Sequence, residues 1–204
     1  MAISNAELGQ IYSMGVGKLA WLGDDGSGTA NSRQMIAQTS PFEFANQTIG
    51  LGSGVLNLSP IMIAAGQTIR NITFLGAATR SAGTHFWYAL YDDGRGSTSA
   101  NQLALLSQTS DNTGAGLLTT GALFSQALIQ PYTTTYSGLY FIGAASVGTS
   151  ASIEASTTVG TGVPFAPWGT GSVPGTAGSG LTNQAPSPSG AITPLAFILY
   201  GFVS

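Results

Sequence analysis

The stretch THFWYALYD, from Thr84 to Asp92, decides how this sequence folds. It is rich in aromatic residues, too short for a substantial helix, and followed by the turn residues Asp93 and Gly94, so it predicts a β-strand. Alternate residues of a strand face opposite sides of a sheet. One face then carries Phe86, Tyr88 and Leu90, and the other carries His85, Trp87, Ala89 and Tyr91.

A strand with rings on both faces needs cover on both faces. In a two-sheet sandwich one face is the core. The second face must be covered by the N-terminal segment, by a Pro/Gly-rich loop or by another subunit. This requirement favours an oligomer or a larger assembly.

Short apolar segments separated by turn residues lie on both sides of this stretch, as in sandwiches and barrels. The other predicted strands are 55–58 and 61–63 on either side of Pro60, 68–75, 102–109, 123–130, 138–147, 151–159 and 195–203, with 123–130 ambiguous between strand and helix. We therefore predict an all-β fold: a jelly-roll-like two-sheet sandwich of about eight strands, spanning residues 55–204, with an extended N-terminal arm.

Two segments differ from this pattern. Residues 1–54 hold isolated apolar clusters between Gly, Asn, Ser and acidic turns, which predicts an N-terminal arm for docking or assembly. Residues 159–194 are rich in Pro and Gly but also contain Phe165 and Trp168, which linkers rarely carry. Long loops in compact domains are usually functional or interfacial. We expect this loop to be held to the domain by the two rings and to pack on a neighbouring subunit or partner.

The composition excludes several function classes. Charged residues make up 6% of the chain, with Lys and Arg at 5 and Asp and Glu at 8, against roughly 25% in ordinary domains. No basic stripe can form, which argues against nucleic-acid binding. Cysteine is absent, the start MAISNAELGQ lacks a signal-peptide pattern, and no apolar run is long enough for a bilayer. We therefore expect synthesis in the cytoplasm and no membrane insertion.

The sequence gives little support for a catalytic or metal site. His85 is the only histidine, and no G-x-S-x-G sequence accompanies it, so neither a triad nor a zinc site is indicated. Most carboxylates lie in the arm or in turn sequences. Glu154 is placed mid-strand without a partner, and calcium at Asp92 and Asp93 is a weak alternative. We predict no enzymatic activity, no metal and no cofactor.

Aromatic rings that stack on sugars are the basis of a rival interpretation, a carbohydrate-binding module. The candidate rings are Trp87, Tyr88, Tyr91, Tyr132, Tyr136 and Trp168. Burial in a core competes with this interpretation for the rings of the aromatic strand.

Five stretches, taken in order, resemble a family of proteins. They are IMIAAGQTIRNITFLG, AGTHFWYALYDDGR, LALLSQTSDNTG, QPYTTTYSGLYFIGAASVGTSASI and PLAFILYGFVS. In this order they resemble small β-sandwich virion proteins of tailed bacteriophages, especially those of actinobacterial hosts, over about residues 55–204. The run Tyr136 to Gly143, soon after Pro131 and Tyr132, is the most telling part. Such proteins are minor tail, head-fibre or capsid decoration proteins, so the resemblance implies a structural role in a virion.

We therefore expect a capsid decoration or head-fibre protein that docks by its arm and displays the sandwich. Its expected partners are other copies of the chain, in a trimer, and the major capsid protein or other virion proteins. The alternatives are a minor tail protein that contacts the host surface, including its glycans, and the carbohydrate-binding module. The assembly-interface candidates are Ile11, Tyr12, Leu19, Trp21, Leu22, Phe42, Phe44, Trp87, Tyr91, Phe165 and Trp168.

Overall fold

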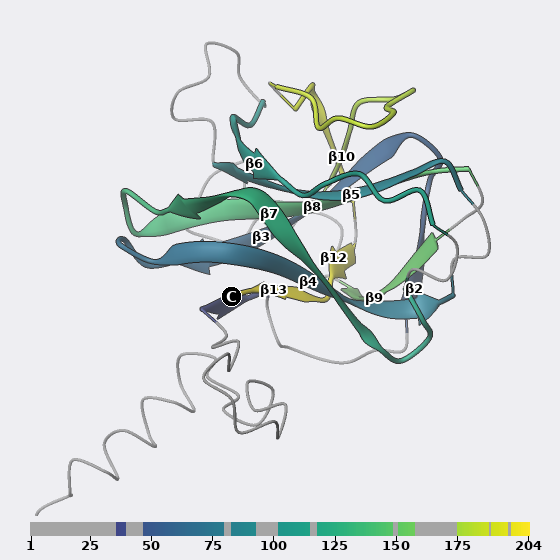
Figure 1. The fold of residues 1–204 in the computed structure, drawn as a ribbon, viewed down its shortest axis with the longest axis horizontal. Helices are drawn as coiled ribbons and strands as arrows, with labels where there is room; N and C mark the ends of the chain where they lie inside the picture. The colour runs from purple at the N-terminus through teal and green to yellow at the C-terminus, as the bar shows by residue number, and fades with distance from the viewer. Residues whose placement is uncertain are drawn as a thin grey trace, which may run out of the picture.

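The computed structural model describes residues 36–39, 47–79, 83–92, 102–114, 118–148, 151–157, 175–187, 189–195 and 197–204. These residues form two antiparallel sheets and no helix, so none crosses a membrane as a helix (Figure 1). The strands are β1 (Ala37–Gln38), β2 (Gln47–Leu51), β3 (Val55–Ile63), β4 (Thr68–Ala78), β5 (His85–Asp92), β6 (Leu105–Gln108), β7 (Leu123–Thr133), β8 (Gly138–Val147), β9 (Ala151–Thr157), β10 (Gly175–Ala177), β11 (Ile192–Pro194), β12 (Phe197–Leu199) and β13 (Gly201–Val203).

Strands β2 to β9 are arranged as a jelly roll. One sheet contains the order β2-β9-β4-β7 and the other the order β3-β8-β5-β6. Two interleaved Greek keys of this kind define the eight-stranded jelly roll. The predicted all-β, jelly-roll-like sandwich is therefore confirmed.

Five short strands enlarge this eight-stranded unit. Strands β1, β12 and β13 complete the seven-stranded sheet, and β10 with β11 extends the six-stranded sheet beyond β3. Because β1 and β2 lie within the range predicted as an arm, the sandwich begins before Val55. The predicted last strand is interrupted at Tyr200, whose N–H donates to Glu154 O and whose carbonyl accepts from Leu75 N–H.

Strand β3 runs without a break through Pro60, where the sequence predicted two separate segments. Proline lacks the N–H needed in the middle of a sheet and is tolerated at an edge. Pro60 is in register with Phe141 of β8, whereas β10 pairs only with Leu56 to Leu58 on the other side. Pro60 therefore lies where β3 has one paired neighbour among the described strands.

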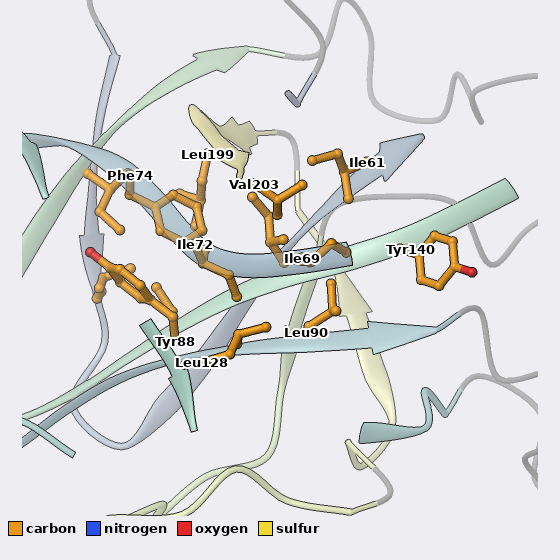
Figure 2. Close-up of a cluster of buried hydrophobic side chains, with 14 of the residues drawn as sticks. Ile61, Ile69, Ile72, Phe74, Tyr88, Leu90, Leu128, Tyr140, Leu199 and Val203 are labelled. Carbon is orange, nitrogen blue, oxygen red and sulfur yellow. The ribbon is translucent and has the colours of Figure 1, made fainter. Parts of the chain in front are cut away.

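The main core fills the space between the two sheets (Figure 2). Phe74 and Tyr88 contact edge to face with ring centroids 4.9 Å apart. On one side the sheets also join directly, because Thr109 forms a β-bridge with Leu128 and Ser107 Oγ donates to Gln130 O at 2.7 Å. Edge strands β6 and β7 are thereby protected along this side.

Candidate functional site

Strand β5 has the two apolar faces that its sequence predicted. Phe86, Tyr88 and Leu90 belong to the core between the sheets. Trp87, Ala89 and Tyr91 point the other way and belong to a second buried cluster on the outer face of the six-stranded sheet. All six side chains have 0% exposure, so the strand is covered on both faces from Phe86 to Tyr91.

The cover of the second cluster is a segment that we call the strap, residues 178–187, which lies above β5 and β8 in Figure 1. The buried residues of this cluster are Leu56, Leu58, Trp87, Ala89, Tyr91, Leu103, Leu139, Phe141, Ala145, Ala177 and Ala185. Leu181 of the strap packs against them while partly exposed. Ala185 is buried, so the strap contributes an apolar side chain to this cluster.

Backbone groups of the strap satisfy the polar tips of the side chains beneath it. Trp87 Nε1 donates to Thr182 O at 2.7 Å, and Tyr91 OH donates to Pro186 O at 3.0 Å. Ala185 N–H donates to Gln108 Oε1 at 2.8 Å. Buried Trp and Tyr need such partners, which explains why an irregular segment lies on this face.

Hydrogen bonds hold the strap near its start and just beyond its end. Leu181 N–H donates to Gly54 O at 3.0 Å. Gly54 has a φ of 69°, and a Cβ there would lie 3.2 Å from the backbone of Leu181, so glycine is required for this approach. Beyond the strap, Ser189 N–H donates to Leu103 O, and Leu103 N–H donates to Ser189 Oγ, both at 3.0 Å.

Of the three possible covers for the second face of β5, the described residues provide the Pro/Gly-rich loop. Trp87 and Tyr91, predicted as assembly-interface candidates, make their contacts within the chain and are fully buried. Burial also raises the pKa of the Tyr91 hydroxyl above its usual value. The described part of the loop therefore packs on its own domain, where the sequence predicted a neighbouring subunit or partner.

His85 forms a fixed pair with Asp111 at the start of β5. The Asp111 carboxylate lies 2.6 Å from His85 Nδ1 and also accepts the Phe86 N–H at 2.9 Å. Asn112 N–H donates to Phe86 O, which ties the same loop to β5 again. The pair thus anchors the segment after β6 to the start of β5.

A buried polar network continues from this loop into the sandwich. Gln126 Oε1 accepts from Asn112 Nδ2 at 2.7 Å and from Thr109 Oγ1 at 3.1 Å, and Thr109 Oγ1 accepts the Tyr88 N–H. Burial raises the pKa of Tyr88 well above its usual value, although Gln126 beside it lowers that pKa. Sequence reasoning missed Gln126, because nothing distinguishes a buried Gln from an exposed one in a polar, alternating strand.

The described carboxylates do not converge. Asp92 ends β5, Asp111 follows β6, and Glu154 lies in β9 opposite Thr48. Within the described ranges, no group of three or more His, Cys, Asp or Glu residues could hold a metal ion. Asp93, the second residue of the calcium alternative, lies outside those ranges.

The rings proposed for sugar stacking are mostly occupied. Trp87, Tyr88 and Tyr91 are buried, and Trp168 is outside the described residues. Tyr136 stacks on Tyr140 with ring centroids 4.8 Å apart, and Tyr140 OH donates to Tyr136 O. Tyr132 and Tyr136 remain half-buried, which leaves little open aromatic surface in the described part of the chain.

Strand β7 carries an apolar row on its outer face. Leu123 and Ile129 are 42% and 59% exposed, and Ala127 between them is exposed. The alternate residues Phe124, Gln126 and Leu128 face inward. We call Leu123, Ala127 and Ile129 the β7 row. The sequence predicted no role for it, because this segment was ambiguous between strand and helix.

The remaining predicted interface residues lie outside the described residues. They are Ile11, Tyr12, Leu19, Trp21, Leu22, Phe42, Phe44, Phe165 and Trp168. In comparisons with known proteins, no family model matches the chain, and no curated sequence matches it significantly.

Proposed function

We propose that this protein is a non-enzymatic structural component of a tailed-phage virion, and that it decorates the capsid or forms a head fibre. Its role is association. The sandwich is displayed outward, and the residues before β1 dock it to the major capsid protein or another virion protein. Association between copies of the chain is part of the proposal, and the trimer remains a prediction from the sequence.

The non-enzymatic part of the proposal is supported by the structural contacts of the described side chains that could have served catalysis or binding. The His85–Asp111 pair anchors a loop, Gln126 links two strands, and Trp87 and Tyr91 hold the strap. A jelly roll of this kind is used for viral capsid and lectin domains among others. Since fold alone does not determine function, the virion role rests on the sequence resemblance.

The choice of decoration over a tail position rests on the sandwich that the described residues form. A single sandwich with one docking segment is sufficient to occupy a lattice site, whereas tail fibres often need long shafts or enzymatic domains. A minor tail protein that contacts the host is the near alternative. Copy number separates the two, because lattice decoration requires hundreds of copies in a particle and a tail tip requires few.

The docking segment is tested by a deletion whose boundary comes from the fold. Removing residues 1–35 leaves β1 and β2 intact, whereas removing residues 1–50 deletes β1 and most of β2 and damages the sheet itself. We expect the chain without residues 1–35 to keep its unfolding temperature but to lose incorporation into particles. Incorporation at the full level would contradict docking by this segment.

The virion role is tested by immunogold electron microscopy of the parent particles, with antibody raised against the recombinant protein. Dense label over heads is the expected result, and quantitative mass spectrometry should give hundreds of copies per particle. Label confined to the tail would move the protein to the alternative position. Absence of the protein from purified particles by mass spectrometry would overturn the virion role itself.

A further inference from the structure

We propose that the free edge of β2 is a two-fold contact, at which a second copy of this chain adds its own β2 as an antiparallel strand. The pairing joins the seven-stranded sheets of two copies into one continuous sheet. The proposal deepens the association part of the proposed function and does not depend on the virion role. Because the pairing joins chains two by two, it links separate trimers as readily as single chains.

Strand β2 has a paired neighbour on one edge only. It pairs with β9 along its whole length and without a bulge. Among the described strands, none pairs with its other edge, at the border of the seven-stranded sheet (Figure 1). Thr48 and Gly50 are exposed, as expected for residues beside an open edge.

The hydrogen bonds of β9 show which backbone groups of β2 face this edge. Residues of an antiparallel pair alternate between those that bond to the neighbouring strand and those that point away from it. Glu154 O accepts from Tyr200 N–H, which follows β12 on the side of β9 away from β2. Thr48 is paired with Glu154, so the N–H and C=O of Thr48 point away from β9. The same holds for Gly50, two residues further on, and both residues therefore present their backbone groups to the open edge.

The edge of β2 carries none of the usual protection against strand pairing. Edge strands are commonly protected by charged side chains, by proline, by a bulge or by cover from another segment. The sequence of β2, QTIGL, has no charged residue and no proline. The edges of β6 and β7, in contrast, are closed onto each other by the Thr109–Leu128 bridge. An unprotected edge of this kind is a template for the addition of another strand.

The order of residues in β2 favours a second copy as the added strand. A two-fold axis through Ile49 places Thr48 of each copy opposite Gly50 of the other. These are the residues whose backbone groups face the edge, so each of the two pairs can exchange two hydrogen bonds. Ile49 packs towards the core, so the Thr48 side chain lies on the outer face. There it meets a glycine at which an added Cβ would have no neighbour within 4 Å, so the pair fits without a clash.

The charge nearest to the edge is compatible with the same axis. Glu154 lies beside Thr48 in β9, and the two copies of Glu154 stand at opposite ends of separate cross-strand rows in the joined sheet. Three strand spacings of about 4.8 Å separate them, which is longer than the Debye length at physiological ionic strength. Like-charge repulsion therefore does not oppose the pairing.

Engineered cysteines can trap the contact, because the chain contains no cysteine of its own. Full-length Thr48→Cys and Gly50→Cys chains, mixed in equal amounts under mild oxidation, should form a disulfide-linked dimer, since Cα atoms paired in this register lie about 5.5 Å apart. Each variant alone should form severalfold less, because its two cysteines are then about 9 Å apart, beyond the reach of a disulfide. Non-reducing electrophoresis would measure the dimer, and peptide mapping by mass spectrometry would identify the bond.

A proline variant tests the hydrogen bonds themselves. Thr48→Pro removes an N–H that points to the open edge and not to β9, so β2 should remain in its own sheet. It should raise the dissociation constant by about tenfold or more, because the two-fold axis removes the bond twice. Sedimentation equilibrium of the full chain over about 10 µM to 1 mM would measure this change. Thr48→Val, which keeps the N–H and suits a strand, is the matched control and should associate like the wild type.

Unfolding temperatures of all variants verify that they fold. A mixture that forms no more covalent dimer than the single variants overturns the two-fold pairing. A wild-type chain that stays monomeric over the whole concentration range, or association that Thr48→Pro leaves unchanged, overturns the contact at β2. None of these outcomes depends on particle incorporation, so the virion role is tested separately.

Discussion

The outer faces of the two sheets differ in what their side chains require. The six-stranded sheet presents Trp87, Tyr91 and Phe141 outward, and the strap covers them so completely that each has 0% exposure. The seven-stranded sheet presents Leu123, Ala127 and Ile129 along β7, and these remain exposed. Large rings with polar tips need a cover that also supplies hydrogen bonds, whereas a few aliphatic side chains on an edge strand can remain exposed.

The difference predicts which residues determine the stability of the fold. The strap turns the outer face of one sheet into part of the folded core, so its residues should affect the unfolding free energy. The β7 row contributes little to the core, so substitutions in it should change the unfolding free energy much less.

The largest expected effect comes from the second cluster. Trp87→Ala should lower the free energy of unfolding by about 3–5 kcal/mol, the usual loss for a buried large aromatic, and should speed proteolysis within the strap. Phe86→Ala on the inner face should cost a similar amount, which urea unfolding would measure. Trp87→Phe is the matched control: it keeps much of the packing but loses the bond to Thr182 O, and it should cost less. A loss below about 1 kcal/mol for Trp87→Ala would mean that the outer face behaves as surface.

Sequence was sufficient to predict the jelly roll, because its deciding signals are local. The alternation in β5 predicted two apolar faces, and the structure confirms both. The position of the strap was harder to predict. Composition identifies it only as a loop, whereas its position depends on the hydrogen bonds that the carbonyls of Thr182 and Pro186 accept from Trp87 and Tyr91. Backbone partners of this kind have no sequence signature.

Short or ambiguous strands also escaped prediction. Strand β2 is ordered by pairing with β9 and not by any strong pattern of its own. Leu123 to Gln130 was ambiguous because its apolar residues also fit a helical spacing, and pairing with β4 decides for a strand. The β7 row could be identified only once that pairing had fixed which residues point outward.

The loss of stability at alkaline pH is a smaller expected effect, and it compares the main core with the second cluster. Burial raises the pKa of Tyr88 in the main core and of Tyr91 in the second cluster. Above about pH 10 the unfolded chain loses these protons while the folded chain keeps them. Stability should therefore be unaffected below that pH and fall above it by about 1.4 kcal/mol per pH unit for each tyrosine.

Urea unfolding between about pH 8 and pH 11.5 would measure this slope, and Tyr88→Phe and Tyr91→Phe should each reduce it by a similar amount. Tyr140 and Tyr200, whose pKa values are also raised by burial, contribute to the slope that remains. If Tyr91→Phe left the slope unchanged, water would have access beneath the strap, and the second cluster would differ from the main core.

The smallest effect on folding is expected at the β7 row. Ile129 is 59% exposed, so Ile129→Thr, which keeps the β-branched shape suited to a strand, should change the free energy of unfolding by no more than about 0.5 kcal/mol. Unfolding is best measured at a protein concentration where the chain is monomeric, because association would add its own stabilisation. Leu128→Ala, at the next residue but facing inward with 5% exposure, is the matched comparison and should cost about 2–5 kcal/mol. A large loss of unfolding free energy from Ile129→Thr in the monomer would show that this residue is needed for folding. The predicted difference between the two outer faces would then be wrong.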